Sequence, residues 1–256
     1  MMAVTRSAFF VASIVALHAT VAGAQARRPR TPPRKPGDLT VDVNVGAQVT
    51  GDDVTQQFSV AKNAEPASIG VKQPFSAGMF IDAGVTVRAR RRLGFAIGVS
   101  VLPRERDAAI AASVPHPVFF NLPRAVNGTT RLSQSQTAVH LDAAYLAPPR
   151  GRLALTLLGG VSIVHIEQAL VTDINVSDPY PFDAPTLASA VTTTASTTPI
   201  GFNVGLDATW RRWRRAGLGA LIRYSRASTT LSAGVAGATN VVAGGLQTGV
   251  GVRFDF

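Results

Sequence analysis

Two histidine–carboxylate pairs are the residues best suited to acid–base chemistry in this sequence. His140 precedes Asp142 by two positions, and His165 precedes Glu167 by the same spacing, so each pair shares one face of an extended strand. A carboxylate beside an imidazole can orient a general base. A hydrolase also needs an activated nucleophile, and no G-x-S-x-G motif accompanies either histidine. We therefore expect no catalytic residues, and a solvated rim explains the second pair equally well.

The sequence gives little support for a metal site, for thiol chemistry or for nucleic-acid binding. The chain has no cysteine, which excludes disulfides and thiolate metal sites. No group of His, Asp and Glu has metal-ligand spacing, so we expect no metal and no other cofactor. The formal net charge of +10 would suit nucleic acid. Its arginines, however, lie in one proline-rich segment and in short turns, and we expect no nucleic-acid partner.

Eight stretches of the sequence alternate between apolar and polar or small residues with the period of a β-strand. Each has about the length, ten residues or so, that a tilted strand needs to cross a bilayer. Eight is also the smallest strand number that closes such a barrel. The stretches are 39–50, 75–88, 93–101, 137–145, 153–163, 200–210, 218–224 and 241–256. The sequence thus predicts an all-β protein with an eight-stranded, antiparallel, up-and-down transmembrane β-barrel over 39–256.

The polar face of these strands would point into the lumen, which side chains can fill in a barrel of this size. Its carboxylates and arginines occur in comparable numbers, and buried charges need partners. We expect a salt-bridged plug that fixes the barrel; the alternative is a polar conduit for a small solute. Phe80 interrupts the pattern, because it falls on the polar face. The expected lumen network is Asp42, Asp82, Arg88, His140, Asp142, Asp207, Arg223, Arg253 and Asp255.

The connections between the stretches alternate in length. Those at 90–92, 148–152 and 211–215 are short and basic, whereas the others are long and rich in Gly, Ser, Thr, Asn and Pro. Outer-membrane barrels have short turns on the periplasmic side and long loops outside. We therefore expect both termini in the periplasm, with the basic turns near anionic headgroups.

The N-terminal residues are typical of a targeting segment. A short basic start, an apolar stretch and the small residues Ala22, Gly23 and Ala24 predict a signal peptide over 1–24, cleaved before Gln25. The alternative is an uncleaved membrane anchor. The following 25–38 is basic and rich in proline, and we expect it to be an extended periplasmic segment.

The last strand carries Val252, Phe254 and Phe256 on one face, with Arg253 and Asp255 on the other. This ending resembles the C-terminal strand of bacterial outer-membrane β-barrel proteins, in which a terminal Phe is an assembly signal. The whole barrel region resembles the small members of that class, such as the OmpA membrane domain, OmpX and OmpW. The resemblance implies a monomer in the bacterial outer membrane, with outer-membrane lipids and the barrel-assembly machinery as partners.

The resemblance leaves three functions open. We favour a structural or surface-interaction role through long extracellular loops, without catalysis and with an unspecified ligand. The alternative is a narrow channel or hydrophobic-ligand conduit of the OmpW kind, and a lipid-modifying barrel enzyme is the least favoured. In the loop at 103–130, we favour Phe119 and Phe120 packing over the barrel mouth or extending the hairpin above the membrane. The alternative is an exposed contact for a ligand or another cell's surface. The segment 186–198 is rich in Ser, Thr and Ala and suggests a flexible tip.

Overall fold

The structure is a computed structural model and describes residues 39–75, 77–232, 234 and 237–256. The expected signal peptide at 1–24 and the basic segment at 25–38 lie outside these described residues. The regular elements of the described chain are eleven β-strands. Within the same ranges, no helix has the length and hydropathy that crossing a membrane requires.

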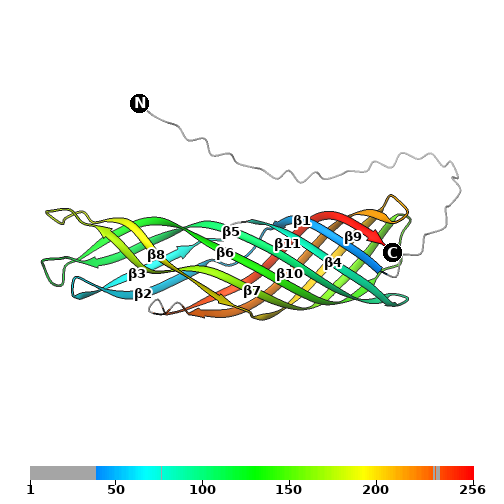
Figure 1. The fold of residues 1–256 in the computed structure, drawn as a ribbon, viewed down its shortest axis with the longest axis horizontal. Helices are drawn as coiled ribbons and strands as arrows, with labels where there is room; N and C mark the ends of the chain where they lie inside the picture. Colours follow the sequence, from blue (N-terminus) through cyan, green and yellow to red (C-terminus); the bar gives the residue numbers. More distant parts are fainter. Residues whose placement is uncertain (1–38, 76, 233, 235–236) are drawn as a thin grey trace, which may run out of the picture. The chain divides into compact units, whose positions relative to one another are not determined.

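Eight strands pair edge to edge in a closed antiparallel ring (Figure 1). The ring closes because β1 pairs with β4 on one edge and with β11 on the other. These strands contain the eight alternating stretches, so the expected all-β, up-and-down barrel is confirmed. The ring consists of β1 (Leu39–Gln48), β4 (Gly78–Arg90), β5 (Leu93–Pro115), β6 (Pro123–Leu146), β7 (Leu153–Ser177), β9 (Ile200–Arg211), β10 (Ala216–Ser232) and β11 (Ala238–Asp255).

Three further strands lengthen one end of the ring. β2 (Val54–Lys62) and β3 (Glu65–Gln73) form a hairpin that joins β5, and β8 (Thr186–Thr197) joins β7. The expectation of long irregular loops is wrong here. Residues 103–130 belong largely to the far halves of β5 and β6, and 186–198 is mostly β8 instead of a flexible tip. We call this end of the molecule the distal head; it comprises β2, β3, β8 and residues 103–134 and 166–177.

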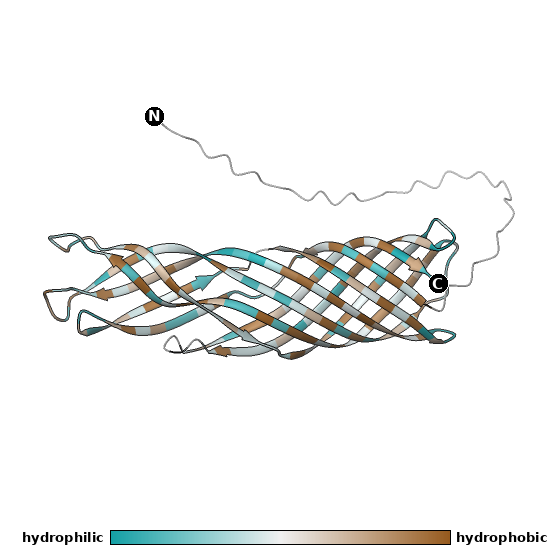
Figure 2. Cartoon of the chain, viewed as in Figure 1, coloured by the Kyte–Doolittle hydropathy of each residue, from teal (hydrophilic) through white to brown (hydrophobic). Residues whose placement is uncertain are grey.

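The polarity of the strand faces reverses where the barrel meets the head, and β5 shows this within one strand. Over 93–101 its outward side chains are exposed and apolar, and its inward ones are small. Beyond Pro103 the outward residues are Glu105 and Asp107, while the inward ones include the buried Ile110. The first arrangement suits lipid outside and a polar interior; the second suits water outside and an apolar interior. Figure 2 shows hydrophobic residues recurring along the strands of the half that carries the C-terminus.

The largest apolar core among the described residues lies inside the distal head. The sheet β2–β3–β5–β6 packs there against β7 and β8, and the ends of β10 and β11 complete the enclosure. Buried aliphatic side chains of this kind are the main stabilising contribution to a water-soluble fold. The core consists of Val54, Phe58, Ala67, Ile69, Val71, Ala108, Ile110, Ala112, Val114, Val126, Leu132, Ala169, Leu170, Val171, Ile174, Leu231 and Val241.

The opposite, proximal end of the barrel gathers the short turns and the ends of the described chain. The backbone N–H of Phe256 donates to the carbonyl of Leu39 at 2.8 Å, and that of Arg211 donates to the carbonyl of Arg152 at 2.8 Å. The turns at 91–92, 147–152 and 212–215 lie at this same end (Figure 1). The alternation of short and long connections therefore corresponds to two different ends of the barrel.

Candidate functional site in the lumen and at the distal tip

Two ion pairs cross the lumen in the proximal half of the barrel. Nη1 of Arg223 on β10 donates to Oδ2 of Asp82 on β4 at 2.7 Å. Nε of Arg253 on β11 donates to Oδ2 of Asp207 on β9 at 3.0 Å. Asn44 on β1 adds a neutral donor, with its Nδ2 2.9 Å from Oδ1 of Asp82. All four charged residues belong to the expected lumen network, and alternation alone places them on the inward face.

A third ion pair closes the proximal mouth. Nε of Arg211 donates to Oδ2 of Asp255 at 2.6 Å, and the hydroxyl of Thr40 donates to Oδ1 of the same carboxylate at 2.8 Å. Arg211 lies at the end of β9, and its side chain points inward, away from the other arginines of the basic turn at 212–215. The sequence interpretation grouped it with that turn and missed this role. The strand parity of β9 could have identified it, because Arg211 has the same inward parity as Asp207 and Thr209.

His140 and Asp142, whose spacing would suit a base–orienter pair, do not bond to each other. Its Nε2 lies 3.1 Å from the hydroxyl of Ser100 and its Nδ1 lies 2.8 Å from the hydroxyl of Ser162. Asn203 donates to the latter oxygen at 2.9 Å. The imidazole is 0% exposed, so the two serines and the histidine form a sealed polar bridge between β5, β6 and β7. Asp142 is buried on the same wall, and its Oδ1 has no hydrogen-bond partner among the described residues.

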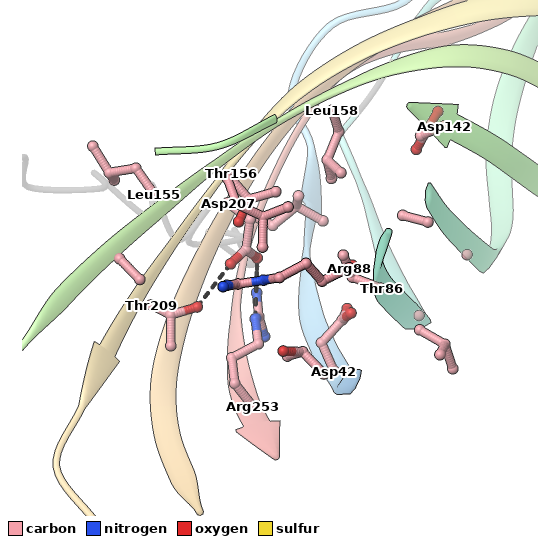
Figure 3. A pocket seen from close by; sticks show the side chains of 18 of the residues that line it. Asp42, Thr86, Arg88, Asp142, Leu155, Thr156, Leu158, Asp207, Thr209 and Arg253 are labelled. Carbon is pink, nitrogen blue, oxygen red and sulfur yellow. Dashed lines mark hydrogen bonds and ion pairs between the residues drawn. The ribbon is translucent and has the colours of Figure 1, made fainter. Parts of the chain in front are cut away.

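A small cavity of about 50 Å³ lies in the proximal lumen. Its wall includes Asp42, Asp142 and Arg88, and Figure 3 shows Arg88, Asp207 and Arg253 pointing toward one another in it. Nε of Arg88 has no hydrogen-bond partner in the described chain. Since one water needs roughly 10–15 Å³ of such space, the cavity has room for a few water molecules. It can hydrate the charges that the ion pairs leave exposed.

Above the ion pairs the lumen contains amides and then the apolar core. Phe80, the residue that interrupts the alternation of β4, is buried inside the barrel. Nε2 of Gln168 donates to Oε1 of Gln73 at 2.9 Å, which joins β7 to β3. The buried glutamines of the described chain are Gln48, Gln56, Gln73, Gln134, Gln136, Gln168 and Gln247. The buried Arg104 and Arg106 lie at the level of these amides, and beyond them the core of the distal head fills the interior.

The far tip of the head carries exposed aromatic side chains. Phe119 and Phe120 in the β5–β6 connection are 61% and 73% exposed, and Tyr180 in the β7–β8 connection is 86% exposed. Phe119 and Phe120 therefore do not pack over the barrel mouth. They lie at the end of the extended β5–β6 hairpin, which was the other form of the favoured interpretation. Val118 and Leu122 add to the same apolar surface. We call these five residues the aromatic tip.

Polar contacts between the hairpins hold the aromatic tip in place. Arg124 on β6 forms a salt bridge of 2.6 Å with Asp178 in the β7–β8 connection. This hydrogen-bonded guanidinium lowers the pKa of Asp178 below its usual value. The carboxylate of Glu65 accepts a hydrogen bond from the backbone N–H of Asn121 at 3.0 Å. All three distal hairpins are thus connected at the tip.

No protein-family model matches the sequence, and no curated protein sequence matches it. The solved structures to which it is similar include Neisserial surface protein A, at 12% identity and a TM-score of 0.47, covering 87% of this chain and 100% of that chain. They also include the outer membrane protein OprG from Pseudomonas aeruginosa, at 10% identity and 0.48, covering 88% and 98%. A third is the outer membrane protease OmpT from Escherichia coli, at 12% identity and 0.46, covering 86% and 97%. The likeness to these proteins concerns the fold alone.

Proposed function

We propose that this protein is an integral β-barrel of the bacterial outer membrane, closed to solutes, whose distal head makes contacts outside the cell without catalysis. The apolar outward residues of the proximal half suit lipid, and the polar outward residues of the head suit water. In this orientation the proximal end faces the periplasm, the lipids and assembly machinery of the outer membrane are its partners, and the barrel is a monomer.

The proposal that the lumen is closed to solutes rests on the apolar core of the head. Its central residues, such as Leu170 and Ile174, are 0% exposed. Ions do not cross a packed aliphatic interior, because the loss of hydration is not compensated there. The proximal cavity therefore has no polar continuation through the described part of the head.

Planar-bilayer recording tests the closed lumen. We expect the reconstituted full chain to show no steady conductance at any voltage that the bilayer tolerates. A steady conductance that responds to the charge of Arg223 or Asp82 would instead support the narrow-channel alternative.

The aromatic tip is the surface that we propose makes the contact. Exposed apolar patches on a soluble surface mark interaction sites, and the ion pair of Arg124 with Asp178 holds this one in a fixed position. Cells that display the double variant Phe119→Ser/Phe120→Ser should adhere less to cell or matrix surfaces than cells with the unchanged chain. The matched control is Thr193→Ala/Thr194→Ala on exposed positions of β8, which alters the head without removing apolar surface. Equal adhesion of all three would contradict the role of the tip.

We propose no catalysis because a substrate could not reach His140. The two serine hydroxyls that contact His140 belong to Ser162 and Ser100, which are 1% and 3% exposed. None of these three residues lines the proximal cavity. Mass spectra of membrane lipids should therefore be unchanged when the protein is expressed. A new lipid species that disappears in His140→Ala would support the barrel-enzyme alternative.

A further inference from the structure

Arg104 on β5 is a buried arginine that no described carboxylate neutralises. Its side chain is 8% exposed. Its Nε and Nη2 atoms have no hydrogen-bond partner among the described residues. Burial, together with the positive charge of Arg106, lowers the pKa of Arg104 to about 10. A buried charge without a counter-charge is unfavourable, so this position calls for an anion.

The contacts of Arg104 fix its direction but supply no acceptor. Its guanidinium carbon lies 5.5 Å from the ring centroid of Phe75, and that of Arg106 lies 5.1 Å from the same centroid. Its stem lies on Gly78, where an added Cβ would stand 2.9 Å from Cδ of Arg104. The glycine and the ring thus hold the guanidinium in place, and two of its nitrogens have no hydrogen-bond partner among the described residues.

Amide side chains occupy the inward positions on the two strands beside Arg104. Arg104, Gln134 and Gln168 are cross-strand neighbours on the inward face of β5, β6 and β7. Gln168 donates to Gln73 at 2.9 Å, and Nε2 of Gln73 has no partner within the described residues. Nε and Nη2 of one guanidinium form the planar fork that binds two oxygens of one oxyanion. The arrangement matches a phosphate group better than a spherical anion.

The strand wall is interrupted beside this site. The β4 ladder along β5 ends at Val101, and the β3 ladder begins at Ala109. Between these ladders the edge of β5 has no strand partner among the described residues. Gly78 lies against the stem of Arg104 there, and the ring of Phe75 lies against its guanidinium. Val101 is the last exposed apolar residue on the outward face before Pro103 and Glu105. The interruption is consequently at the height of the lipid headgroups.

We propose that Arg104 anchors a phosphate-binding site in the wall of the barrel, at the part of β5 that lies between the β4 and β3 ladders. The phosphate is either dissolved or part of a lipid headgroup, because both sources reach this height. The site is distinct from the lumen network and from the aromatic tip, and its lipid source rests on the membrane placement proposed above.

Calorimetric titration of the full chain in phosphate-free maltoside micelles tests the site. One arm adds inorganic phosphate; the other adds lipid A, with the dephosphorylated lipid as its blank. Arg104→Gln should weaken binding by about ten- to hundredfold, the usual effect of losing charged hydrogen bonds. Arg104→Lys, which keeps the charge without the fork, should be intermediate. The matched control Arg131→Gln, an exposed arginine of the same head, should bind like the unchanged chain.

The two arms distinguish the sources of the phosphate. Binding in the first arm assigns dissolved phosphate, and binding in the second arm alone assigns a lipid headgroup. The direction of the change in Tm gives an independent test, because a ligand stabilises the state that binds it. Phosphate should raise the Tm of the unchanged chain but not that of Arg104→Gln, which without phosphate should be at least as stable. Failure of the unchanged chain to bind in both arms, or equal binding by Arg104→Gln, overturns the proposal.

Discussion

Arg223 on β10 and Asp82 on β4 form an ion pair across the lumen, with 2.7 Å between Nη1 and Oδ2. Their strands are not neighbours, since β1 and β11 lie between them in the ring. The pair therefore connects two parts of the wall that no backbone hydrogen bond joins, and Asn44 on β1 bonds to the same carboxylate between them.

Removing one member of this pair should destabilise the barrel strongly. Arg223→Ala leaves Asp82 buried and unpaired, which costs about 3–5 kcal/mol. Arg131→Ala breaks the exposed pair with Asp107, whose side chains are both 69% exposed, and should cost at most about 1 kcal/mol. Urea unfolding of both variants in one detergent measures the difference. Equal losses would show that the transluminal pair contributes no more than a surface pair.

The distal head should respond separately to changes in its own core. Leu170→Ala removes a fully buried side chain and should cost the head about 2–5 kcal/mol. We expect faster proteolysis within the head while the barrel stays heat-modifiable on gels. Leu157→Ala, on the exposed outward face of the same strand, is the control and should leave head proteolysis unchanged. Loss of the folded barrel in Leu170→Ala would mean that head and barrel unfold as one unit.

The fixed position of the aromatic tip should depend on pH through Asp178. Its pKa is lowered in the folded head by the hydrogen bond from Arg124, so folding favours the charged carboxylate. The contribution is present above the unfolded pKa, about 4, and is lost as pH falls through the lower folded value. Proteolysis of the tip by an acid-active protease should accelerate below about pH 4. Asp178→Asn should lose this part of the acid response; an unchanged response would assign it to another carboxylate.

The two ends of the barrel should differ in accessibility on intact cells. Ser189→Cys lies on an exposed position of β8 in the head, whereas Arg214→Cys lies in a proximal turn. A membrane-impermeant maleimide should label the first in intact cells and the second only after the membrane is broken. Labelling in the reverse order would place the head in the periplasm and refute the proposed contacts outside the cell.

Alternation predicted the strands of the proximal half because lipid and lumen impose opposite demands on their two faces. Beyond Pro103 the polarity of the two faces is reversed: Ala108 and Ile110 face inward, and Glu105 faces outward. A search for apolar residues on the outward face therefore ends at Val101 and treats the rest as loop. β2, β3 and β8 were missed for the same reason.

The sequence could not predict which of the lumen charges pair with one another. Strand parity points Asp82, Asp207, Arg223 and Arg253 inward, but pairing across the lumen depends on the tilt and register of strands that are not adjacent. Arg104 has inward parity as well. It was not included in the predicted lumen network because residues 103–130 were interpreted as a loop.

The uninterrupted course of β5 and β6 has a mechanical consequence. Their ladder runs from Leu93 opposite Tyr145 to Pro115 opposite Pro123 without a change of register, so the hairpin passes from lipid to water with no hinge. Hydrogen bonds between antiparallel strands lie perpendicular to the chain. A pull on the aromatic tip along these strands loads both of them in the same direction, so it is resisted in shear by the ladders that join β5 to β4 and β6 to β7. The continuous β5–β6 hairpin therefore transmits tension from the distal head directly to the barrel.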